Sequence, residues 1–222
     1  MFAAGSLVRG EGTEKSDIDL HIIFANEDLP KAYRDTVIYY DYICELFVQN
    51  ENAFEYFLGQ EPGDGTPVIM TMDIEGVPFG DREYAAEIKR RAKDMLAAGP
   101  LPLTEDQIMA KRYSITDLMD DIPAKNDGEL LGTLSVLQQR LGDFFLRANN
   151  RWSGHRKSLH RALRNYDSDF AERYVRAFSA AFRENDMAPL EKLVDEVLAP
   201  FGGRLMAGYK SFAPDKANRP KE

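Results

Sequence analysis

The first hundred residues alternate between strand-like and helix-like patterns. Residues 16–24, SDIDLHIIF, alternate apolar and polar side chains, which is typical of a strand. The apolar positions are Ile18, Leu20, Ile22 and Phe24, and the polar positions between them are Asp17, Asp19 and His21. The alternation predicts a strand with its apolar face buried.

The secondary structure of the next segments is predicted from residue type as well as from the spacing of apolar residues. Residues 36–49, TVIYYDYICELFVQ, are rich in β-branched and aromatic residues and predict one long strand or a tight strand pair. Residues 50–58 predict a short helix, and the glycines and prolines of residues 59–67 predict a loop.

Helical periodicity takes over from about Asp81. Residues 81–99 contain good helix formers and end at Gly99-Pro100, a stop signal. Residues 99–107, GPLPLTEDQ, are the predicted linker, and Thr104 suits a helix N-cap. Amphipathic helices are then expected at about 104–121, 127–149, 156–165, 167–184 and 187–199.

These elements predict an α+β fold in two domains. Residues 1–99 form a domain of strands and helices, and residues 104–222 form an all-helical bundle. The polar end, about 212–222, is expected to be a flexible tail.

Composition narrows the classes of function. The 222 residues include 28 Lys and Arg and 37 Asp and Glu, a net charge of −9, which disfavours wide contact with a nucleic acid backbone. Cys44 is the only cysteine, so an intramolecular disulfide and a cysteine-rich metal site are excluded. Because no apolar run is long enough to span a bilayer and no signal pattern opens the chain, we expect a cytoplasmic protein without membrane contact.

Two aspartates on the first predicted strand are the strongest chemical signal. Asp17 and Asp19 point the same way, about 6.5–7 Å apart along the strand, so both carboxylates can reach one hard cation such as Mg²⁺. A third carboxylate from a neighbouring strand would allow a two-metal site. Glu45 and Asp41 are the candidates, since both fall on one face of a continuous strand.

The segment before these aspartates suits a phosphate group. Gly5 permits close approach of the backbone, and Ser6 adds a hydroxyl that can bind phosphate oxygens. Gly10 and Gly12 let the loop return, and Ser16 directly precedes the strand. An isolated Gly-Ser turn or a pair of solvated aspartates is common, but their combination in register predicts a phosphate cradle beside a metal-binding strand.

The string from Gly5 to Leu20 resembles the signature of the polymerase β-type nucleotidyltransferase superfamily. The resemblance implies a small mixed β-sheet with flanking helices, with Glu45 as the third metal ligand. Weaker similarity at 112–122 and 149–163 points to the bacterial branch related to aminoglycoside nucleotidyltransferases. Only four residues precede Gly5, so the first strand is expected to be very short, or the chain starts late.

The resemblance also assigns roles to basic and acidic residues elsewhere. Lys157 would reach the triphosphate, and Asp143 would be the general base for a substrate hydroxyl. From its own place in the glycine-rich loop, Arg9 is a further candidate to neutralise phosphate charge. For each of these three residues a solvated surface side chain is the competing interpretation. His21 is expected to lie beyond the metal.

The implied reaction transfers a nucleoside monophosphate from ATP or another nucleoside triphosphate to a hydroxyl of a small acceptor. Two Mg²⁺ ions are the expected cofactors, an aminoglycoside-like cation is a possible acceptor, and a homodimer is a possible assembly. Nucleotidylation of a protein or an RNA, and a non-catalytic nucleotide-binding or interaction module, are the alternatives.

Overall fold

The computed structural model describes residues 1–24, 31–122 and 127–212. The chain divides into two compact units, Met1–Leu101 and Pro102–Glu222. The expected flexible tail lies, from residue 213 onward, outside the described residues.

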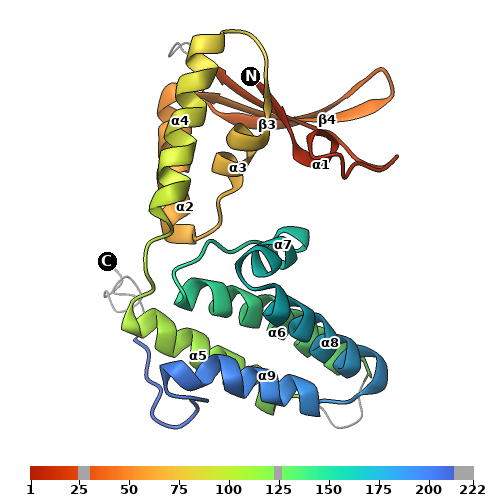
Figure 1. The fold of residues 1–222 in the computed structure, drawn as a ribbon, viewed down its shortest axis with the longest axis vertical. Coiled ribbons are helices and arrows are strands. Elements are labelled where there is room, and N and C mark those ends of the chain that lie inside the picture. Colours follow the sequence, from red (N-terminus) through yellow and green to blue (C-terminus); the bar gives the residue numbers. More distant parts are fainter. Residues whose placement is uncertain (25–30, 123–126, 213–222) are drawn as a thin grey trace, which may run out of the picture. The chain divides into compact units, whose positions relative to one another are not determined.

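A mixed five-stranded sheet organises the first unit (Figure 1). Its order is β3-β4-β2-β1-β5, with β2 and β4 parallel and the other neighbours antiparallel. The strands are β1 (Phe2–Ala4), β2 (Ile18–Phe24), β3 (Tyr33–Tyr39), β4 (Tyr42–Asn50) and β5 (Val77–Pro78). This sheet confirms the expected α+β class, and β1 is indeed short, at three residues.

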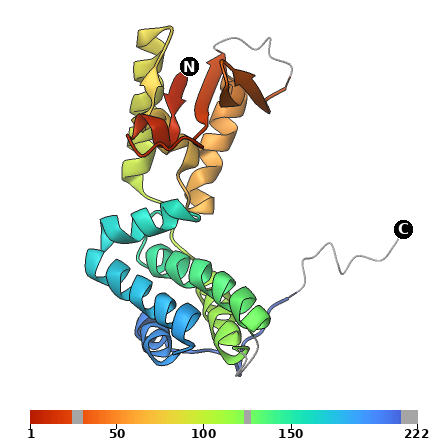
Figure 2. The same ribbon diagram turned by 90° about the vertical axis from the view of Figure 1, so that its right-hand side faces the viewer.

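The longer helices of this unit pack against the sheet, and a single-turn helix directly follows β1 (Figure 2). They are α1 (Gly5–Val8), α2 (Glu51–Asp64), α3 (Val68–Glu75) and α4 (Arg82–Ala98). The core contains Phe2 from β1, Phe54 from α2, Met70 from α3 and Ile88 from α4, all fully buried. Removing these side chains from water stabilises the unit by about 1.5–3 kcal/mol each.

The prediction of the buried face of β2 was wrong. Ile18, Leu20 and Ile22 are only half-buried and Phe24 is 44% exposed, whereas His21 and Ile23 on the opposite face are 1% and 8% exposed. The reason is that α2 and α3 pack on the face that carries His21. The His21 ring lies 6.0 Å from that of Phe54 on α2, and its Nδ1 contacts Asp73 on α3.

The segment 36–49 forms a strand pair rather than one strand. Tyr39 pairs with Tyr42, and Tyr40 and Asp41 between them have φ values of 46° and 67°. Positive φ at both central residues is the geometry of a tight two-residue hairpin turn.

The prediction of a loop at 59–67 was right only for residues 65–67, because α2 continues through Pro62 to Asp64 and is capped by Gly65 with φ 71°. Glu61 lies in this additional part of α2 and is only 5% exposed. It accepts hydrogen bonds from the backbone N–H groups of Ile69 and Met70 in the first turn of α3. The extension of α2 therefore satisfies donors that α3 would otherwise leave unpaired.

The second unit consists of helices in its described part. They are α5 (Glu105–Asp120), α6 (Asp127–Ala148), α7 (Lys157–Tyr166), α8 (Ser168–Glu184), α9 (Ala188–Leu198) and a 3₁₀ turn (Ala199–Phe201). Thr104 caps the start of α5 as expected, and it also forms a capping box with Gln107. A core stripe on α6 contains Leu130, Leu134, Leu137, Leu141 and Phe144. In the described part of the chain, no helix combines the length and the apolar character needed to cross a bilayer.

Candidate metal and nucleotide site

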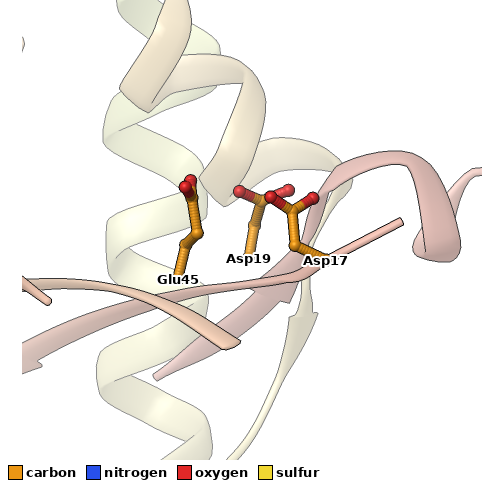
Figure 3. A group of neighbouring side chains, drawn as sticks. All are labelled: Asp17, Asp19 and Glu45. Carbon is orange, nitrogen blue, oxygen red and sulfur yellow. The ribbon is translucent and has the colours of Figure 1, made fainter. Parts of the chain in front are cut away.

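Three carboxylates gather at one end of the parallel strands (Figure 3). Asp17 directly precedes β2, Asp19 lies on β2, and Glu45 lies on β4, where the parallel register places it beside Asp19. Each offers a ligand oxygen, and these oxygens lie within 4.8 Å of one another. Asp17, Asp19 and Glu45, called the carboxylate cluster below, are all half-buried and point to the same side of their strands.

Partial burial and like charges oppose ionisation of Asp19 within the carboxylate cluster. Burial raises the pKa of Asp19, and the nearby charges of Asp17 and Glu45 raise it further. The positive charges of Arg34 and Arg9 lower this pKa and only partly offset the increase. A bound cation would remove the repulsion, so the electrostatics favour a positively charged ligand.

Gly5 makes room for the Asp19 carboxylate. The residue has φ +83°, and a Cβ atom at this position would lie 1.9 Å from Asp19 Oδ2. Since real Cβ atoms do not approach oxygen so closely, only glycine fits here. The backbone at Gly5 thus forms a close-fitting wall beside the carboxylate cluster.

The loop after Gly5 is closed by its own hydroxyl groups. Ser6 Oγ donates to Ser16 Oγ at 3.2 Å, and the Thr13 N–H donates to the same Ser16 oxygen at 2.9 Å. Gly10, with φ +72°, lets the chain turn back toward β2. These bonds hold Ser6 and Ser16, two of the predicted phosphate-binding residues, together at the start of β2.

Arg9 and Arg34, whose charges act on Asp19, both lie in ion pairs. Arg9 contacts Glu11 and Glu75, each at 3.1 Å, so its guanidinium has two carboxylate partners. Arg34 on β3 places Nη2 2.5 Å from Glu45 Oε2. The sequence had given no role to Arg34, because its link to Glu45 depends on the pairing of β3 with β4.

Asp41 lies apart from the carboxylate cluster. It sits in the exposed turn of the β3–β4 hairpin, whereas Glu45 lies beside Asp19. Of the two acids that the sequence left open as the third carboxylate, the fold thus brings Glu45 to Asp17 and Asp19.

Asp143 and Lys157 belong to the second unit. Asp143 on α6 accepts from Lys111 Nζ at 2.7 Å, and Lys157 is an exposed residue at the start of α7. Their expected roles as general base and triphosphate ligand remain predictions.

A second polar cluster is buried further along β2. His21 Nδ1 lies 2.6 Å from Asp73 Oδ1, and His21 Nε2 lies 3.3 Å from Gln49 Oε1. His21, Asp73 and Gln49 are all buried, and they are called the histidine cluster below. The sequence could not reveal this cluster, because Asp73 is 52 residues from His21 and lies on the unpredicted α3.

Comparison with known proteins bears on the first unit. Residues 1–58 match a nucleotidyltransferase domain. The matched segment holds the whole carboxylate cluster with Gly5 and Ser6, and it supports the resemblance to the nucleotidyltransferase superfamily. It does not address the aminoglycoside-related branch.

The other comparisons add little. The chain is similar to the solved structure of a nucleotidyltransferase-like protein from Exiguobacterium sibiricum 255-15. The two are 12% identical, with a TM-score of 0.34 over 85% of this chain and 69% of that chain. Among curated proteins, none matches the chain significantly.

The oxygens of the carboxylate cluster fit a hard divalent cation. Mg²⁺ prefers oxygen ligands and is commonly held by one or two carboxylates together with substrate phosphates. The carboxylate cluster supplies such oxygens, and the glycine wall at Gly5 leaves the Asp19 carboxylate free of a side-chain clash. Asp17, Asp19 and Glu45 are therefore suited to hold the metal that a nucleotidyltransferase domain implies.

Proposed function

We propose that the chain is a metal-dependent nucleotidyltransferase. It would move a nucleoside monophosphate from a nucleoside triphosphate to a hydroxyl group of a small acceptor and release pyrophosphate. The observation that carries the proposal is the meeting of Asp17, Asp19 and Glu45 within a segment that matches a nucleotidyltransferase domain.

The residues of the first unit have separate tasks in this proposal. Asp17, Asp19 and Glu45 would hold two Mg²⁺ ions, which supply activation of the α-phosphate and charge neutralisation for the leaving pyrophosphate. Gly5 would let the backbone approach the β- and γ-phosphates, while the Ser6 and Ser16 hydroxyls would bind their oxygens. Arg9 would contribute positive charge at the same loop.

The reaction is a substitution at phosphorus. The acceptor oxygen forms a bond to the α-phosphorus, the bond from this phosphorus to the oxygen bridging the α- and β-phosphates breaks, and pyrophosphate leaves with that oxygen. Asp143 would take the proton of the acceptor hydroxyl, and Lys157 would bind the triphosphate. The net charge of −9 favours a cationic acceptor, such as an aminoglycoside-like molecule, and we propose ATP as donor in the cytoplasm.

Release of pyrophosphate tests this proposal directly. The full chain is incubated with Mg²⁺, each of the four common nucleoside triphosphates and a panel of acceptors that includes aminoglycosides, peptides and RNA. We expect release with at least one small cationic acceptor, and a loss of about 10³-fold or more in Asp17→Asn and Asp19→Asn.

Asp41→Asn is the matched control, because it removes an exposed aspartate from the turn of the β3–β4 hairpin, away from the carboxylate cluster. It should keep wild-type release. Normal release by the Asp17→Asn, Asp19→Asn double variant would contradict the proposal. Nucleotide binding without release for any acceptor would favour a non-catalytic module instead.

A further inference from the structure

Arg34 is the basic residue in contact with the carboxylate cluster in the described structure. Its Nη2 lies 2.5 Å from Glu45 Oε2, and its guanidinium carbon lies 4.6 Å from the centre of the Phe47 ring. The side chain is nevertheless 59% exposed. An arginine that is anchored at one end and open to solvent can exchange one anionic partner for another.

The pairing of β3 with β4 explains this contact. Arg34 pairs with Phe47 and Thr36 pairs with Glu45, so Arg34 and Glu45 lie diagonally on the same face. Side chains at such diagonal positions of an antiparallel pair are within reach when they are long. The contact between Arg34 and Glu45 is thus built into the hairpin register.

The two arginines near the site differ in their partners. Arg9 contacts Glu11 and Glu75, neither of which belongs to the carboxylate cluster. Arg34 instead contacts one of the three proposed metal ligands themselves. A divalent ion that approaches Glu45 alone must compete with the guanidinium and is repelled by its charge.

We propose that Arg34 makes the site select the metal–triphosphate complex over the free divalent ion. This inference rests on the proposed function of the carboxylate cluster. A free ion meets the Arg34 charge at full strength, so its affinity is reduced. A triphosphate brings several negative charges and bidentate acceptor oxygens, which a guanidinium binds well, so Arg34 leaves Glu45 for the nucleotide.

Two titrations with opposite expected signs test the role of Arg34. In the first, Mn²⁺ alone is titrated into the full chain by calorimetry, with electron paramagnetic resonance of the free ion as a second readout. Arg34→Met should bind Mn²⁺ about three- to tenfold more tightly than wild type, because the competing charge is gone. Arg34→Lys, which keeps the charge, should stay within about twofold.

In the second titration, Mn²⁺ is saturating and the α,β-methylene analogue of ATP is added. Arg34→Met should bind this analogue about three- to tenfold more weakly than wild type, since a phosphate ligand is lost. Arg90→Met is the matched control, because Arg90 is 61% exposed and pairs with Glu87 and Asp94 on α4. It should change neither affinity.

The inference would be overturned if Arg34→Met bound Mn²⁺ no more tightly than wild type does. It would also be overturned if Arg34→Met bound the ATP analogue as tightly as wild type does. The Asp17→Asn, Asp19→Asn double variant separates this failure from that of the proposed function. If the double variant binds Mn²⁺ as wild type does, the carboxylate cluster is not the metal site. If it loses Mn²⁺ while Arg34→Met is unchanged, only the role of Arg34 is wrong.

Discussion

Two polar clusters lie on the same face of the first unit's sheet, and their charges are arranged in opposite ways. The carboxylate cluster brings three acids within 4.8 Å of one another and leaves them half-exposed. The histidine cluster begins only two residues after Asp19, yet it joins one acid to an imidazole and an amide and is buried.

The difference separates a site for a ligand from a structural contact. Burial and like charges raise the pKa of Asp19, so the carboxylate cluster costs stability unless a cation binds. In the histidine cluster, both ring nitrogens of His21 have hydrogen-bond partners within the cluster. Asp73 Oδ2 has no hydrogen-bond partner in the described structure. Substitutions in the first cluster should therefore change activity, and those in the second should change stability.

After the Asp17→Asn and Asp19→Asn substitutions, Gly5→Ala should give the largest effect on activity. The added Cβ would collide with the Asp19 carboxylate, and φ +83° is strained for alanine. We expect nucleotidyl transfer to fall about 10²-fold or more, with a loss of about 1–3 kcal/mol in the free energy of unfolding. Pyrophosphate release and urea denaturation measure the two quantities.

Gly10→Ala is the control for this substitution. Gly10 has a similar φ of +72°, but a Cβ there would meet no atom within 4 Å. It should lose stability to backbone strain while keeping most of its activity. Equal losses of activity in both variants would show that contact with Asp19 is not what requires Gly5.

Asp73→Asn should give the next largest effect, on stability. It replaces the carboxyl group that contacts the buried His21 ring by an amide, and we expect a loss of about 1–3 kcal/mol in the free energy of unfolding. Urea denaturation of the full chain measures this loss, and calorimetry should show unchanged Mn²⁺ affinity in the folded variant. A loss of Mn²⁺ affinity at full folding would mean that the two clusters do not act separately.

The smallest expected effect is on the melting temperature of Asp19→Asn, which should rise at pH 7 without added metal. A carboxyl whose pKa is raised in the folded state favours folding while protonated, and this contribution is lost as the pH rises through the folded pKa. Because Asp19 is partly exposed to screening solvent, we expect a rise of only about 1–2 °C over wild type. Thermal scans at several pH values should show the advantage fading as the pH falls through the carboxyl range. A lower melting temperature at pH 7 would contradict the assigned repulsion.

Local patterns predicted much of the fold and the centre of the site. Some features depend only on residues close together in the sequence, so the sequence reveals them. They are the alternation around Asp17 and Asp19, the strand-forming residues of β3 and β4, and the N-cap at Thr104. The helices that pack on β2 determine which of its faces is buried. The alternation of apolar and polar residues alone could not predict that the face of His21 and Ile23 is the buried one.

The missed features depend on contacts between distant segments. Gly59 and Pro62 locally favour a loop, but α2 continues past both of them. In the longer helix, Glu61 accepts a hydrogen bond from the backbone at the start of α3, a contact between segments that the local pattern does not show. The contact of Arg34 with Glu45 follows from hairpin register, and a shift of one residue would place Arg34 on the other face.

Crystals grown with Mn²⁺ and the α,β-methylene analogue of ATP test the central claim most directly, because Mn²⁺ can be located by its anomalous scattering. The account predicts Mn²⁺ in contact with the carboxylates of Asp17, Asp19 and Glu45, with phosphate oxygens of the analogue completing its coordination beside Gly5 and Ser6. An analogue bound elsewhere, with no Mn²⁺ at these three carboxylates, would contradict it.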